Sequence, residues 1–215
     1  MTLTPNDLIS VQQWRYASKK MDPLKKLTAE QWKALETSLH LTPSSYGLQP
    51  WMFIVVQDKA LRDQLLPLTW NQKQVVDCSQ YVIFCAKEKV DEAHITHFVE
   101  QSAKVNGVDA SALENYRQMM IGDLVKGPRS QWISEWATRQ CYIALGNLMT
   151  SAALIGVDTC PIEGFKSDKY DEVLELKKLG LKSVVCCAVG HRAADDKYAH
   201  SKKVRFDLNE VLQYR

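Results

Sequence analysis

Four short segments, far apart in the sequence, carry the residues best suited to bind a charged and flat ligand. They are RYASKK (15–20), PSSYGLQPW (43–51), PIEGF (161–165) and KKVRF (202–206). The first and last supply Arg and Lys, which bind phosphate, and a guanidinium does so in a bidentate way. The other two predict tight loops with free backbone donors and an apolar surface. Together they offer what a ligand with a phosphate group and a flat ring needs.

Several common kinds of site are missing from the sequence. It has no GxGxxG fingerprint, no Walker loop, no HExxH metal motif and no GxSxG nucleophile motif. His94 and His97 have HxxH spacing, but no third ligand accompanies them, so we interpret them as residues of a surface helix. The net charge is only +2, and the basic residues are scattered apart from the cluster at 202–205, which argues against nucleic acid as the main partner.

The six cysteines predict no metal site and no catalytic thiol. They form no CxxC pair, and several lie in apolar runs such as YVIFCA and SVVCCAVG, where a thiol behaves as a small hydrophobic group. We therefore expect reduced core cysteines in a cytoplasmic protein. The segment MTLTPNDLIS also lacks the basic and apolar regions of a signal peptide.

One long uncharged run is interpreted as a buried helix. No residue from 141 to 157 is charged, but the run is shorter than the ~20 residues that a membrane span needs. We therefore expect no membrane partner. The helix itself is predicted over 131–155. Because its second half is apolar all round, it should be enclosed on every side, at the centre of the domain or of a dimer interface.

The remaining pattern predicts one α+β domain covering 1–215. Thr4 and Pro5 begin a helix that runs to about residue 14, and Thr28 with Gln31 forms a capping box for a second helix that ends near residue 40. The run 52–56 is apolar on both faces and is predicted to be a central strand. Further strands are expected at 81–86, 158–161 and 183–190. Further helices are expected at 59–66, 72–78, 92–105, 111–125 and 167–176.

The order and spacing of the four segments resemble the FMN-dependent nitroreductase and flavin reductase family over nearly the whole chain. The resemblance implies a small, mostly antiparallel sheet of four to five strands flanked by helices. It also implies an intertwined homodimer with FMN at the subunit interface. In the implied ping-pong reaction, NADH or NADPH gives a hydride to FMN, and a nitroaromatic, a quinone or a free flavin then takes two electrons. A dedicated flavin reductase and a flavin-storing or redox-sensing protein are the alternatives.

The resemblance assigns the two ends of the chain to the phosphate. Arg15 would bind it, Tyr16 and Ala17 would contact the cofactor, and Lys203 and Arg205 would complete the anion site. Ala17 stands where a serine is common, so one hydroxyl donor is lost. From the residues alone, Arg15 is also a suitable cation for a helix C-terminus, and 202–206 is also consistent with a solvated tail.

The loop 43–49 would reach the FMN of the other subunit through Pro43, Ser44 and Ser45. Gly47 stands where an asparagine is usual, which removes one polar contact. Gln49 also belongs to the motif.

The ring edge is assigned to two further segments. Lys19 would lie near N1 and O2 of the flavin, and Asn71 near N3 and O4. Many family members have a lysine where this chain has Gln74. Either the Gln74 amide replaces that cation or the adjacent Lys73 swings in.

The segment PIEGF is the most specific of the four. By the resemblance, the backbone N–H of Glu163 approaches flavin N5 and that of Gly164 approaches O4. Pro161 and Ile162 would stack on one face of the ring.

Four residues are candidates for the wall of the acceptor pocket: Trp70, Tyr116, Met119 and Met120. Methionine and aromatic residues at helical spacing are also typical of a core, and the sequence leaves both interpretations open. No side chain stands out as a catalytic acid or base, so we expect the flavin to carry the chemistry.

Overall fold

A four-stranded sheet organises the computed structural model, which describes residues 3–215. Within these residues the strands are β1 (Trp51–Val56), β2 (Gln80–Lys87), β3 (Asp158–Ile162) and β4 (Leu181–Gly190), in the order β1-β2-β4-β3. All three neighbouring pairs are antiparallel. The predicted α+β class and antiparallel pairing are confirmed. Met1 and Thr2, which the expected domain and the N-terminal segment include, lie outside the described residues.

β1 is an edge strand, whereas the sequence predicted a central one. It pairs with β2 alone, and most of its residues are only half-buried. Apolar side chains on both faces of a strand indicate that both faces are covered, here by helices. They do not indicate how many strands lie beside it, and the prediction of a central position was wrong for that reason.

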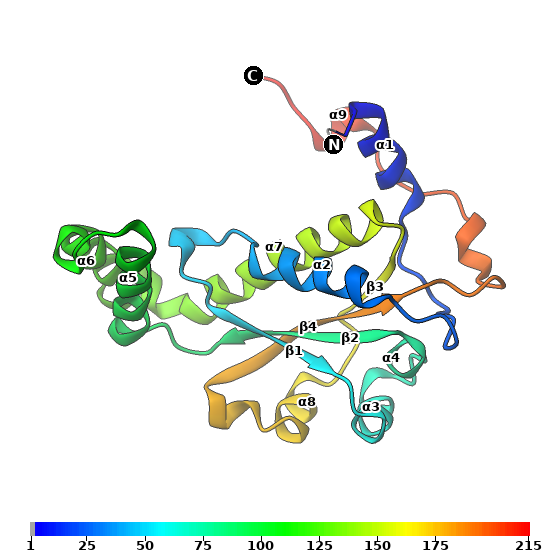
Figure 1. Cartoon of the computed structure of the whole chain (residues 1–215), viewed down its shortest axis with the longest axis horizontal. Helices are drawn as coiled ribbons and strands as arrows, with labels where there is room; N and C mark the ends of the chain where they lie inside the picture. The colour runs from blue at the N-terminus through cyan, green and yellow to red at the C-terminus, as the bar shows by residue number, and fades with distance from the viewer. Residues whose placement is uncertain (1–2) are drawn as a thin grey trace.

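Alternating side chains of β2 divide the core into two layers. Val82 and Phe84 pack into the layer that contains α7 (Ile133–Leu154), which we call the α7 layer, whereas Tyr81 and Ile83 pack into the layer on the other face of the sheet. This alternation is what a strand between two covered faces requires. The helices are α2 (Ala29–His40) and α7 (Ile133–Leu154) on one face, and α3 (Lys59–Leu65), α4 (Gln74–Asp77) and α8 (Ser167–Val173) on the other (Figure 1).

The helix expected over 111–125 is broken into three pieces. A 3-10 turn (Ala110–Leu113) precedes α6 (Glu114–Ile121), and a π turn (Gly122–Lys126) follows it. With α5 (Glu92–Asn106), α6 forms a lobe at one end of the sheet (Figure 1). The turn closes at Gly127, where a Cβ would lie 2.6 Å from the Gly122 carbonyl oxygen, so a larger residue does not fit.

One side of α7 is exposed within the single chain, although the sequence predicted a helix enclosed on every side. Tyr142 and Ile143 are 40% and 46% exposed, and Leu154 is also exposed, while the other sides are buried against β2 and α2. We call these three residues the α7 strip. No helix among residues 3–215 is long and apolar enough to cross a membrane.

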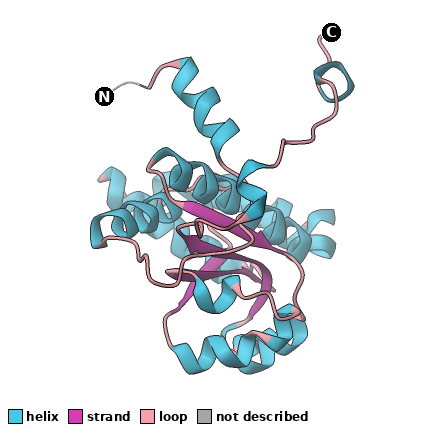
Figure 2. Cartoon of the chain, turned by 90° about the vertical axis from the view of Figure 1, so that its right-hand side faces the viewer, coloured by secondary structure: helices cyan, strands magenta, loops and turns pink. Residues whose placement is uncertain are grey.

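Both ends of the chain project from the body of the molecule. α1 (Pro5–Trp14) and α9 (Leu208–Val211) stand away from the sheet, as Figures 1 and 2 show. Every residue of 201–215 is exposed, including the apolar Val204 and Phe206. Thr4 caps α1 with Pro5 as its first residue, and Thr28 and Gln31 form the predicted capping box of α2.

The α7 layer provides a test of the packing. Leu148 is fully buried in it, so Leu148→Ala should lower the free energy of unfolding by about 2–5 kcal/mol through lost burial and a residual cavity. Urea denaturation at fixed protein concentration measures this change. Val105→Ala is the control because Val105 is 83% exposed, and it should change the free energy by less than ~0.5 kcal/mol. Equal effects of the two variants would contradict the assignment of Leu148 to the core.

Candidate functional site

The segment 15–20 lies along the outer edge of β3. Ala17 forms a parallel bridge with Thr159, and the Ser18 N–H donates to the Thr159 carbonyl oxygen at 3.1 Å. The chain is extended here because an edge strand offers backbone groups that an extended neighbour satisfies. This pairing places RYASKK beside the strand that leads into PIEGF.

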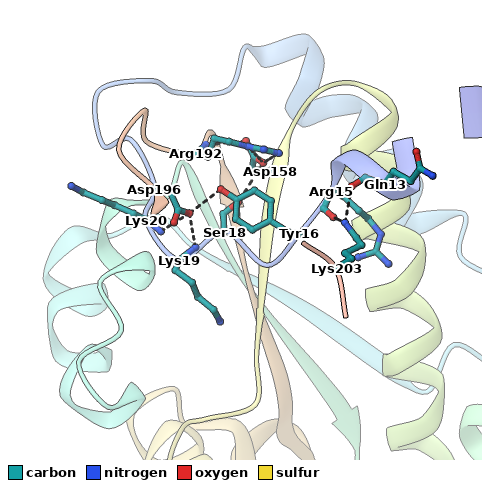
Figure 3. Close-up of polar contacts among 10 residues, drawn as sticks. All are labelled: Gln13, Arg15, Tyr16, Ser18, Lys19, Lys20, Asp158, Arg192, Asp196 and Lys203. Carbon is teal, nitrogen blue, oxygen red and sulfur yellow. Dashed lines mark hydrogen bonds and ion pairs between the residues drawn. The ribbon is translucent and has the colours of Figure 1, made fainter. Parts of the chain in front are cut away.

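A buried ion pair fixes the loop after β4 against the same edge. The Arg192 Nε donates to the Asp158 carboxylate at 2.7 Å, and the Arg192 backbone N–H donates to its other oxygen at 2.9 Å. The guanidinium lies 4.2 Å from the ring centroid of Trp14 and 4.5 Å from that of Tyr16, which are cation–π distances. Figure 3 shows Arg192 beside Asp158 and Tyr16. These four residues thus hold the C-terminal loop close to the phosphate-binding candidates.

The predicted phosphate residues converge although 188 residues separate Arg15 from Lys203. The Lys203 ammonium donates to the carbonyl oxygens of Arg15 and Gln13, at the C-terminal end of α1 (Figure 3). Burial and the positive charges of Arg15 and Arg205 lower the pKa of Lys203. A cluster whose cations repel one another is suited to receive an anion.

A hollow of about 590 Å³ opens beside this cluster. Tyr16, Ala17, Lys203 and Arg205 line it. The Arg205 side chain has only its neighbouring Val204 carbonyl oxygen as a partner within the described residues. Residues of both terminal segments therefore line one hollow, although Arg15 itself is not among them.

A second hollow of about 430 Å³ brings the ring-edge candidates together. Lys19, Asn71 and Gln74 line it, with Lys73 at the same hollow. Gln74 is 5% exposed and its amide lies 3.9 Å from the Cys160 sulfur, whereas Lys73 is exposed. Of the two alternatives left open by the sequence, the structure places the amide inside and the ammonium at the rim.

The PIEGF loop has two backbone donors without a protein partner. Neither the N–H of Glu163 nor that of Gly164 donates to an acceptor in residues 3–215. The Gly164 carbonyl oxygen accepts from the Gln72 amide at 3.0 Å, and the Glu163 carboxylate accepts from the Tyr142 hydroxyl. Backbone donors on a loop held in this way suit the edge of a flavin ring.

Trp70 packs directly on this loop. A Cβ at Gly164 would lie 2.5 Å from the Trp70 ring, so the close contact requires glycine. Trp70 is 67% exposed and is placed to form a wall. Pro161 is half-buried at the end of β3. Ile162 is 2% exposed and packs in the core layer on the face of the sheet opposite α7, so only the Ile162 backbone is available to a ring.

The loop 43–49 lies elsewhere in the chain. It is at the end of α2 opposite α1, beside α5 (Figure 1). The Ser44 hydroxyl accepts from the Gln49 N–H at 2.9 Å, and the Ser45 N–H donates to the Gln140 amide oxygen at 2.9 Å. Gly47 has φ +74°, a conformation that favours glycine. Pro43 is exposed. Within one chain these residues do not join the two hollows.

Two acceptor-pocket candidates lie with that loop rather than with Trp70. The Tyr116 hydroxyl donates to the Tyr46 carbonyl oxygen at 3.2 Å, and Met119 is exposed on the same helix. Met120 is fully buried in the α7 layer, so the core interpretation holds for it. The chain therefore carries two separate groups of predicted residues.

Comparison with known proteins decides the family. The model of the nitroreductase family matches residues 13–191. The chain belongs to the nitroreductase family. The family membership that the four segments predicted is confirmed, and the matched residues include three of the four segments.

Relatives and solved structures agree with this membership. The chain is 35% identical to "Putative NAD(P)H nitroreductase SERP2086" of Staphylococcus epidermidis, over 96% of each chain. It is 32% identical to "Putative NAD(P)H nitroreductase SH0546" of Staphylococcus haemolyticus over the whole of both chains. Its fold is similar to that of the nitroreductase ydfN of Bacillus subtilis, with a TM-score of 0.85 at 18% identity, covering 99% of this chain and 100% of that one. A structure described as "a putative nitroreductase in complex with FMN" from Exiguobacterium sibiricum gives a TM-score of 0.82 at 22% identity, covering both chains completely. The predicted fold class is thereby confirmed.

Sequence reasoning missed three residues that position the candidate site: Asp158, Arg192 and Asp196. Asp158 ends a stretch without charge, and a lone Asp at the start of a buried strand signals a buried partner. Arg192 and Asp196 lie in HRAADDK, which reads as a solvated loop. No local pattern identifies their partners, which are 34 and 180 residues away.

The phosphate cluster leads to a binding prediction. Arg205→Ala should weaken FMN binding by roughly 10- to 150-fold, because a hydrogen bond to a charged group contributes about 1.5–3 kcal/mol. Fluorescence titration measures the dissociation constant. Riboflavin, which lacks the phosphate, should bind equally well to the variant and the wild type. Arg215→Ala, at the end of the exposed arm, is the control. An unchanged constant for Arg205→Ala would remove Arg205 from the anchor.

Cys160, the cysteine nearest the ring-edge hollow, leads to a prediction about catalysis. Burial raises the pKa of Cys160, so its thiol stays protonated and is a poor nucleophile. Cys160→Ser should leave turnover within a few-fold of the wild type in a steady-state assay. Loss of hydride transfer while FMN is still bound would assign the thiol a catalytic role.

Proposed function

We infer that this nitroreductase-family protein is an FMN-dependent NAD(P)H oxidoreductase that reduces nitroaromatics, quinones or related acceptors. The observation that carries the inference is the convergence of the first, third and last segments at one edge of β3. A cationic cluster lies at one end of that edge, and ring-edge amides and unpaired backbone donors lie at the other. Names among its relatives and the FMN-bound structural neighbour support the same conclusion.

The residues present fit FMN. Arg15, Lys203 and Arg205 would hold the phosphate. Lys203 and Arg205 line the hollow, and the positive charge of nearby Arg15 helps to lower the pKa of Lys203. Lys19, Asn71 and Gln74 would face the polar edge of the ring. The N–H groups of Glu163 and Gly164 supply donors on a loop that Trp70 braces.

When bound, FMN supplies the hydride acceptor and the two-electron chemistry. The protein orients the ring and stabilises charge. The Lys19 ammonium is the cation that would offset negative charge at the ring edge of the reduced cofactor. No acid or base is evident beside it, so we expect water to supply the protons.

We propose a homodimer, with each protomer a single domain of residues 1–215. The α7 strip offers apolar surface to a second copy. The loop 43–49, with Tyr116 and Met119 beside it, does not join the two hollows of its own chain. A partner subunit would bring its own copy of these residues to the hollows. All six cysteines are free and buried, which suits a cytoplasmic location.

A dedicated flavin reductase is the second candidate. One structural neighbour, from Staphylococcus epidermidis, is named an NAD(P)H:FMN oxidoreductase and aligns with a TM-score of 0.79 over all of this chain. The acceptor, not the hydride donor, separates the two activities.

Anaerobic stopped-flow spectroscopy tests the function. The purified protein should be yellow, with about one FMN per chain, and NADH or NADPH should bleach it rapidly. Reoxidation by a quinone or nitroaromatic identifies a nitroreductase, whereas reoxidation only by free flavin identifies a flavin reductase. A protein that binds FMN but is not reduced by either nicotinamide is a storage or sensing protein. A colourless protein that cannot be reconstituted refutes the assignment.

A further inference from the structure

One buried carboxylate fastens the loop after β4 to the segment 15–20. Asp196 is 3% exposed. Its Oδ2 accepts from the Tyr16 hydroxyl at 2.9 Å and from the backbone N–H groups of Lys19 and Lys20 at 2.9 and 3.2 Å (Figure 3). Its Oδ1 accepts from the backbone N–H of Tyr198 at 3.1 Å. A single side chain therefore satisfies four donors from two distant parts of the chain.

These bonds fix the course of the chain between the two ends of the FMN site. Asp196 holds the Lys19 backbone on one side, and the Lys19 side chain points away from it, as Figure 3 shows. That side chain lines the ring-edge hollow with Asn71 and Gln74. Tyr16, also held by Asp196, follows directly on Arg15.

The neighbouring carboxylate has no such role. Asp195 forms an ion pair with the Lys20 ammonium, and its side chain is 69% exposed. An exposed pair of this kind contributes little to stability and fixes no backbone. The two adjacent aspartates thus carry the same charge but differ in what they hold.

We propose that Asp196 is a positioning residue of the FMN site, which sets the spacing between the phosphate anchor and the ring-edge cation Lys19. This inference rests on the proposed function. An asparagine cannot take its place, because one of its two terminal atoms is a donor. That NH₂ group would face either the Tyr198 N–H or the three donors from segment 15–20.

The test compares Asp196→Asn with the wild type in three measurements. These are the dissociation constants of FMN and riboflavin and the midpoint potential of bound FMN. We expect both ligands to bind about tenfold or more weakly, since the segment serves phosphate and ring alike. We expect a lower midpoint potential, because a displaced Lys19 stabilises the reduced flavin less. If Asp196 acted only as a nearby negative charge, its removal would raise the potential. A raised or unchanged potential therefore overturns the proposal.

Two further variants complete the design. Asp195→Asn removes the same charge one residue away, from a side chain that also lines the ring-edge hollow. It should leave both dissociation constants unchanged and should not lower the midpoint potential. Equal effects of both variants would overturn the proposal. If Asp196→Asn does not fold, as judged by circular dichroism, Tyr16→Phe removes one donor and keeps the carboxylate. It should shift binding and potential in the same direction by a smaller amount, and no shift would overturn the proposal. A wild type that binds no flavin refutes the proposed function itself, whereas a normal wild type with an unaffected Asp196→Asn refutes only the role of Asp196.

Discussion

The outer edge of β3 is the constraint on which the candidate site depends. β3 has a neighbouring strand on one side only, so its other edge presents backbone groups that another segment must satisfy. Ala17 and Ser18 satisfy them through Thr159. An extended chain advances about 3.3 Å per residue, so Arg15 and Lys19 lie at most about 13 Å apart. The edge thus fixes the candidate phosphate residue and the candidate ring-edge residue at a distance that one ligand can span.

A buried ion pair makes that arrangement specific. Asp158 begins β3 and is 4% exposed, and its only ionic partner within residues 3–215 is Arg192. Removing one partner of such a pair leaves an unpaired charge in the core, which is strongly destabilising. The pair therefore ties the exit of β4 to the entry of β3. Since the Arg192 guanidinium also contacts the rings of Trp14 and Tyr16, the end of α1 and the C-terminal loop are held by the same residue.

Local signals predicted the elements well, and long-range pairing explains what they missed. Thr28 and Gln31 are three residues apart, so their capping box is readable from the sequence. The edge position of β1 is not readable, because hydropathy reports the covering of faces and not the number of neighbouring strands. Gln74 and Lys73 are adjacent, and only the packing of α4 decides that the amide is buried. Asp196 was missed because the donors that it binds in segment 15–20 lie about 180 residues away in the sequence.

The candidate site also depends on surface that one chain leaves uncovered. Tyr142 belongs to the α7 strip, and its hydroxyl donates to the Glu163 carboxylate of the PIEGF loop. The apolar strip and the ring-binding loop are therefore joined by one contact. In the proposed dimer, a second copy packed on the α7 strip would contact Tyr142 and so affect the position of the PIEGF loop. Binding of FMN to that loop and association of the chains would then favour each other, because a coupling between two binding events is reciprocal. In that proposed dimer, the loop 43–49, which lies at the end of α2 opposite α1 (Figure 1), would be available to the partner's half of the site.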